Sequence, residues 1–105
     1  MKLDVNTGSI ITQEEAKALI AAFKTKFPGE VTSSFIGANN VENILDQENC
    51  IGIRVYNGYD ITDEKLNLVL VGVDENGEDL LENEIIYDRL GLCPTICPIG
   101  GLSIK

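Results

Sequence analysis

The chain has 105 residues, of which 44% are hydrophobic and 24% charged, which is the size and composition of one globular domain. It contains no apolar run of the roughly 20 residues that span a membrane. Residues 1–9 lack the basic and apolar stretches of a secretory signal. We therefore expect a single soluble domain over residues 1–105, located in the cytoplasm.

The net charge of −9 is concentrated in one part of the chain. Residues 42–88 contain thirteen acidic residues and only two basic ones, Arg54 and Lys65. Phosphate groups are bound by lysine and arginine, so this surface argues against direct binding of nucleic acid or of anionic membranes. It would instead attract a basic protein partner or a divalent cation, or simply keep the protein in solution.

A first helix is predicted over residues 13–27. Thr12 followed by Glu15 is the pattern of a capping box, in which the two residues satisfy each other's free backbone N–H groups. Pro28 and Gly29 end the helix. Its apolar residues recur at helical spacing and are Ala16, Leu19, Ile20, Phe23 and Phe27.

A second, shorter helix is predicted over residues 40–48. Val41, Ile44 and Leu45 form one apolar face, and polar residues that can cap a helix precede them. The connector between the two helices, residues 30–36, contains strand-like residues but has no clear pattern.

From Cys50 onward the apolar residues alternate with others, which predicts a strand over residues 51–57. A nearly continuous apolar run then predicts a central strand over residues 66–74. A hairpin turn at residues 74–77 leads to a third strand within residues 79–87.

These elements predict an α+β fold, in which the two N-terminal helices pack on one face of a small antiparallel β-meander. Residues 90–105 are rich in cysteine, proline and glycine, and we expect them to form an irregular C-terminal tail.

The sharpest motif is Cys93-Pro94-Thr95-Ile96-Cys97-Pro98 in this tail. Two thiols four residues apart can form a disulfide or bind a soft metal. With Cys50 and one carboxylate they could also hold zinc, provided that the tail folds back beside Cys50. The simplest interpretation is that all three cysteines are packing residues, because a reducing cytoplasm disfavours a disulfide. We therefore expect no cofactor, with zinc or copper at the cysteines as the alternative.

The same six residues resemble the copper-binding motif of the Sco-type copper chaperones, which implies that Cys93 and Cys97 are copper ligands. This chain has no histidine for the third ligand. Its motif also lies near the end of the chain, whereas in that family it lies at the start of a thioredoxin-like fold. The copper function is therefore not carried over.

Arg54 and Tyr56 alternate on the predicted strand and should share its outer face. Exposed arginine and tyrosine are favoured at interfaces, and arginine binds carboxylates in two-point contacts. Two uses follow: a binding surface for a partner, or an internal salt bridge from Arg54 to a neighbouring acid, with Tyr56 covering the sheet.

The arrangement of the whole chain resembles a group of short bacterial proteins with no assigned function. The likeness rests on Gly52-Ile53-Arg54-Val55-Tyr56, on Leu68–Asp74 followed by Asn76-Gly77, and on the Cys-Pro-x-x-Cys tail. It implies the same order of helix, strand pair and cysteine tail, and no activity.

The functional hypothesis is a binding or protein-interaction module that is not an enzyme. The absence of histidine removes the commonest general base and metal ligand, and no nucleotide-binding or nucleophile motif is present. The alternative is a thiol site in the tail that binds metal or cycles between redox states. The oligomeric state is not indicated.

Overall fold

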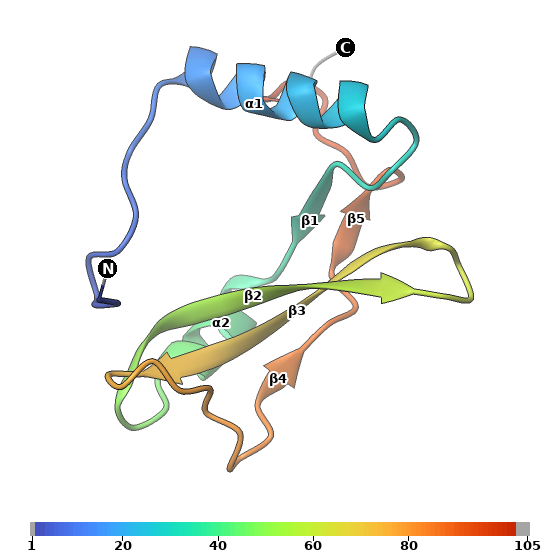
Figure 1. The fold of residues 1–105 in the computed structure, drawn as a ribbon. Helices are drawn as coiled ribbons and strands as arrows, with labels where there is room; N and C mark the ends of the chain where they lie inside the picture. Colours follow the sequence, from blue (N-terminus) through green and yellow to red (C-terminus); the bar gives the residue numbers. More distant parts are fainter. Residues whose placement is uncertain (1, 103–105) are drawn as a thin grey trace. The chain divides into compact units, whose positions relative to one another are not determined.

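A computed structural model describes residues 2–102, which form two compact units (Figure 1). The sheet unit consists of residues 2–8 and 36–90, and the terminal unit consists of residues 9–35 and 91–102. The chain contains two helices and two antiparallel sheets, which confirms the α+β class. That the whole chain is one domain stays a prediction.

The sheet unit is built on a three-stranded antiparallel sheet in the order β2-β3-β4. Strand β2 (Cys50–Asp60) and strand β3 (Lys65–Asp74) form a long hairpin, which confirms the strands predicted over residues 51–57 and 66–74. The central position of β3 is also confirmed. Four successive residues, 70–73, are buried, so both faces of the strand are covered there.

A third strand lies within residues 79–87, as predicted, but it occupies only the end of that range. Strand β4 contains only Ile86–Tyr87, and Asp79 forms one isolated bridge with Val73. Between them, Glu84 has a φ of 54°, a left-handed conformation that interrupts extended pairing. Its N–H donates to the carbonyl oxygen of Leu81 in a turn.

Helix α2 (Ala38–Leu45) packs against one face of β2 and β3. It begins two residues before the predicted helix over residues 40–48 and ends three residues earlier. The side chain of Ile44 is fully buried, and Asn43 Nδ2 donates to the hydroxyl of Tyr87 at 2.9 Å. This contact connects the helix with the short strand β4.

The terminal unit contains helix α1 (Gln13–Lys26) and a pair of short strands (Figure 1). The predicted capping box is present: the Thr12 side chain accepts from the N–H of Glu15, and the Glu15 side chain accepts from the N–H of Thr12. Only part of the apolar stripe is covered, since Ile20 and Phe23 are half-buried but Leu19 is 66% exposed. The packing of this helix on the sheet stays a prediction.

Strands β1 (Ser33–Phe35) and β5 (Gly91–Cys93) pair antiparallel, with Ser33 opposite Cys93 and Phe35 opposite Gly91. The connector over residues 30–36 therefore contains a strand. The expected irregular tail also begins with one, because a partner distant in sequence supplies backbone hydrogen bonds that no local pattern reveals. Residues 103–105 of the predicted tail lie outside the described residues. Within residues 2–102, no helix is long and apolar enough to cross a membrane.

Candidate functional site

Arg54, Tyr56 and Asp79 form a polar cluster on one face of the sheet unit. Arg54 and Tyr56 are two residues apart on β2 and share a face, and the turn after β3 brings Asp79 to them. Arg54 Nη1 donates to Asp79 Oδ1 at 2.6 Å and to the carbonyl oxygen of Gly77 at 3.2 Å. The hydroxyl of Tyr56 donates to Asp79 Oδ2. The two oxygens of one carboxylate thus serve two different donors.

These bonds shift the titration of all three groups. The pKa of Asp79 is held below its ordinary value, first by the hydrogen bond from Tyr56 and then by Arg54. The pKa of Tyr56 is raised, first by its bond to Asp79 and then by the loss of solvent around the hydroxyl. The pKa of Arg54 is also raised, chiefly by its hydrogen bond to Asp79. At neutral pH the cluster is a charged pair with a neutral tyrosine.

This geometry matches the internal salt bridge, the second use considered for Arg54. The Arg54 side chain is 33% exposed and its guanidinium already binds a carboxylate, so it is not presented to a partner as a free cation. Tyr56 is 46% exposed and keeps an accessible ring. Of the two residues predicted to form a binding surface, Tyr56 is therefore the one that stays available to a partner.

Asp79 and the carbonyl oxygen of Gly77 were not predicted as site residues. Asp79 is one of seven acids in residues 74–88, and nothing in its neighbourhood distinguishes it from the others. The signal that could have found it is the hairpin turn at residues 74–77. That turn returns the chain antiparallel to β3 and places residue 79 opposite Val73.

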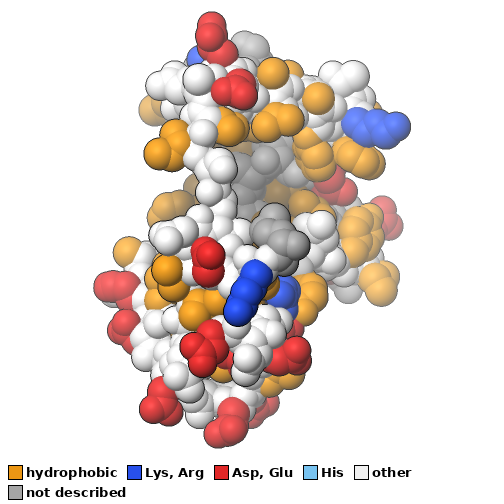
Figure 2. All heavy atoms as spheres, turned by 60° about the vertical axis from the view of Figure 1, so that its left-hand side comes forward, with side chains coloured by type: hydrophobic (Ala, Val, Ile, Leu, Met, Phe, Trp, Pro, Cys, Tyr) orange, Lys and Arg blue, Asp and Glu red, His pale blue; other side chains and the backbone are white. Residues whose placement is uncertain are grey.

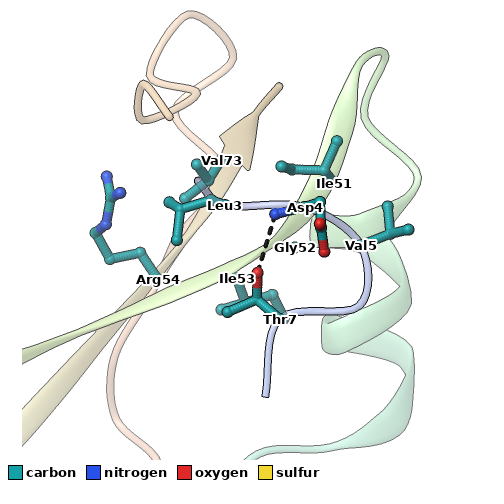
Figure 3. Close-up of a pocket in the computed structure, with 9 residues that line it drawn as sticks. All are labelled: Leu3, Asp4, Val5, Thr7, Ile51, Gly52, Ile53, Arg54 and Val73. Atoms are coloured by element: carbon teal, nitrogen blue, oxygen red, sulfur yellow. Dashed lines mark hydrogen bonds between the residues drawn. The ribbon is translucent and has the colours of Figure 1, made fainter. Parts of the chain in front are cut away.

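A pocket of about 330 Å³ lies beside this cluster, where the N-terminal segment crosses the start of β2 (Figure 3). The segment folds into a local turn in which the N–H of Asp4 donates to Thr7 Oγ1 at 2.9 Å. The ionisable side chains in the pocket wall are those of Asp4 and Arg54, and the latter is held by Asp79. The complete lining is Leu3, Asp4, Val5, Thr7, Ile51, Gly52, Ile53, Arg54 and Val73. Five of these nine residues are aliphatic, and the lining brings no set of acid and base groups together.

In the terminal unit, Cys93 and Cys97 are joined in a disulfide with their Cα atoms 4.8 Å apart. Cys93 lies in β5 and is 8% exposed, whereas Cys97 follows the strand and is exposed. The N–H and the hydroxyl of Thr32 both donate to the carbonyl oxygen of Cys93. Packing, a disulfide and metal binding were the alternatives for these two cysteines, and the structure shows the disulfide.

Cys50 is a free thiol at the start of β2 in the sheet unit, and its Sγ donates to the carbonyl oxygen of Gly52 at 3.3 Å. It is half-buried beside α2, in keeping with a packing residue. Within residues 2–102, no group of three or more cysteine, aspartate and glutamate residues is arranged to hold a metal ion. The three cysteines therefore form no zinc site in the described part of the chain.

The outer end of the β2–β3 hairpin carries exposed apolar side chains. Tyr59, near the end of β2, is 59% exposed, and Ile61, in the turn that follows, is 84% exposed; Val55 and Tyr56 precede them on β2. Figure 2 shows the side of the molecule that lies to the left in Figure 1, where hydrophobic side chains also lie on the surface among acidic ones. Strand β2 is also an edge strand, since β3 is its only partner in the described sheet.

Comparison with known proteins gives no relative: no protein-family model, no curated protein and no solved structure matches this chain. The function is therefore argued from the site alone.

Proposed function

We propose that this protein is a non-enzymatic interaction module that binds an extended, basic segment of a partner protein along the free edge of β2. The observation that carries the proposal is the set of exposed apolar side chains of Val55, Tyr56 and Tyr59 on this edge strand and of Ile61 just beyond it, in an acidic part of the chain. An edge strand offers unpaired backbone N–H and C=O groups, to which another strand can add.

Side chains at this edge are suited to a protein partner. Tyr56 and Tyr59 are three residues apart and therefore point to opposite faces of the strand, where each can pack beside an added strand. Tyrosine contributes a large contact area and is enriched at protein interfaces. The aromatic rings would supply affinity, and the added backbone hydrogen bonds would fix the orientation.

Charge supports a basic partner. Residues 42–88 carry thirteen acids against Arg54 and Lys65, and Arg54 is neutralised by Asp79. Asp60, Asp63 and Glu64 lie at the hairpin end next to the exposed apolar residues. A segment rich in lysine or arginine would be attracted to this end, and an acidic one repelled. A cytoplasmic location is part of the same proposal.

A peptide titration tests the proposal. We expect a synthetic peptide of alternating valine and lysine to shift backbone amide NMR signals of residues 55–61, while the valine–glutamate peptide of equal length shifts none. Binding should weaken as salt rises, because the attraction is between exposed charges. Equal binding of both peptides, or shifts confined to other residues, would contradict the proposal.

Two substitutions provide the matched comparison. Tyr59→Ala removes an exposed ring from the hairpin and should weaken binding of the basic peptide roughly tenfold, as for a moderately important interface residue. Leu19→Ala removes an apolar side chain of similar exposure from α1 and should leave binding unchanged. If both variants bind as tightly as the original protein, the hairpin is not the docking surface.

A further inference from the structure

We propose that Cys93 and Cys97 form a thiol–disulfide exchange site, in which Cys97 is the sulfur that an incoming thiolate attacks and Cys93 is the thiol that leaves. The substrate class is a thiol or dithiol. This activity is separate from the binding proposed for the β2–β3 hairpin, since the two cysteines lie in the terminal unit.

The two sulfurs differ in access. A thiolate attacks a disulfide along the S–S axis, from the side opposite the sulfur that leaves. Cys97 is exposed, so attack on its sulfur comes from solvent. Cys93 is only 8% exposed within β5, so the residues around it hinder attack on its sulfur. The fold therefore directs exchange to Cys97.

After the attack, the released Cys93 thiol stays close to Cys97. Cys93 is paired with Ser33 across the two strands, and its carbonyl oxygen accepts two hydrogen bonds from Thr32. Cys97 follows in the tail, where the N–H of Ile96 donates to the carbonyl oxygen of Leu92. One cysteine is thus anchored by the strand pair, and the other is presented by a short segment beyond it.

The chemical steps balance as follows. An incoming thiolate forms an S–S bond with Cys97, and the electron pair of the broken bond leaves on Cys93, which takes a proton from water. If a second thiolate of the substrate then attacks the substrate's own sulfur, Cys97 leaves as a thiolate and also takes a proton from water. The substrate dithiol has become a disulfide, and the protein has gained two electrons as two thiols.

The size of the disulfide ring favours exchange over a purely structural role. The bridge closes a ring of only five residues, 93–97. Because a disulfide stabilises a fold by restricting the unfolded chain, and more so for longer loops, this ring is among those that contribute least. In a reducing cytoplasm, disulfides are mostly transient and take part in catalysis or redox sensing.

Trapping the mixed disulfide tests the proposal. The full chain with Cys50→Ser, which removes the free thiol, is oxidised and incubated under native conditions with reduced glutathione. The reaction is quenched with acid, and peptides are mapped by mass spectrometry. We expect glutathione on Cys97 and a free thiol on Cys93. Adducts mainly on Cys93, or no adduct until urea is added, would overturn the proposal.

A second measurement does not require the disulfide. In the Cys50→Ser background, Cys93→Ser leaves only Cys97, and Cys97→Ser leaves only Cys93. We expect Cys97 to be alkylated roughly tenfold faster than Cys93 in native buffer, and at the same rate in urea, because burial alone separates them. Equal native rates would contradict the assignment of the attacked sulfur.

The source of the thiol is decided by two parallel reactions. Reduced glutathione represents a small thiol, and reduced thioredoxin represents a protein dithiol. Faster reduction by thioredoxin at equal thiol concentration supports a protein substrate, and faster reduction by glutathione supports a small one. Failure of both reagents to reduce the native pair overturns the site.

Discussion

The hydroxyl of Tyr56 and the guanidinium of Arg54 converge on one carboxylate, so the charge of Asp79 determines whether both bonds persist. The sequence offered an internal acidic partner as one of two uses for Arg54, because residues 42–88 contain thirteen acids. It could not indicate which acid, since the choice depends on the turn that places residue 79 opposite Val73.

The cluster predicts a pH dependence of stability. The folded pKa of Asp79 lies below its ordinary value of 3.8, so its contribution is present above that pH and is lost as the pH falls through the folded value. The folded pKa of Tyr56 lies above its ordinary value of 10.0, so its contribution is present below that pH and is lost as the pH rises through the folded value. The cluster stabilises the fold between these limits.

Asp79→Asn should therefore lower the Tm by a few degrees at neutral pH and flatten the loss of stability at both ends of the pH range. Thermal unfolding followed at a series of pH values measures both effects. Glu82→Gln is the matched control, because Glu82 is an exposed acid in the same segment. This change should alter neither the Tm at neutral pH nor the pH dependence of stability. An Asp79→Asn curve that runs parallel to that of the original protein would show that the cluster does not link pH to folding.

At the scale of elements, periodic patterns predicted the helices and strands that depend on neighbouring residues. They missed the strands that depend on a partner far away in the sequence. The capping box placed the start of α1, and the apolar run of residues 66–73 placed β3 at the centre of its sheet. Strands β1 and β5 were missed because each has three residues and exists only through the other, more than fifty positions away. The third strand was overextended because a left-handed residue interrupts an otherwise plausible pattern.

Gly72 tests the packing of α2 on β3. A Cβ atom at this position would lie 3.0 Å from the Sγ of Cys50 and 3.3 Å from Cγ2 of the fully buried Ile44. We expect Gly72→Ala to lower the free energy of unfolding by about 1–3 kcal/mol, because these close neighbours must move to make room.

The control for this change is on the neighbouring strand. A Cβ atom at Gly52 would meet no atom within 4 Å, so Gly52→Ala should be neutral or stabilise by up to about 1 kcal/mol. Urea denaturation of the two variants gives the comparison. Equal stability of both would mean that α2 does not pack over Gly72.

At the scale of the whole molecule, the question is whether the two units unfold together. All three tyrosines, at positions 56, 59 and 87, belong to the sheet unit, and the chain has no tryptophan. Tyrosine fluorescence therefore reports on the sheet unit alone. Tyrosine fluorescence can therefore show whether a substitution that destabilises the terminal unit also destabilises the sheet unit.

Thr12→Ala is such a substitution, because it removes the N-cap of α1 and should cost about 1 kcal/mol. If the chain is one cooperative domain, as its length suggests, the tyrosine transition should move down by about 4–8 °C. Thr12→Ser keeps the N-cap and should leave the temperature of the tyrosine transition unchanged. A tyrosine transition that does not move in Thr12→Ala would show that the units unfold independently.

The pairing of Phe35 with Gly91 has a consequence for the architecture of the chain. These two residues are the last before and the first after residues 36–90, which carry the three-stranded sheet. The segment therefore enters and leaves through neighbouring points, as an insertion within a host loop does. Another sequence with adjacent termini could therefore be grafted between Phe35 and Gly91, provided that residues 2–8, which belong to the sheet unit, are removed together with residues 36–90.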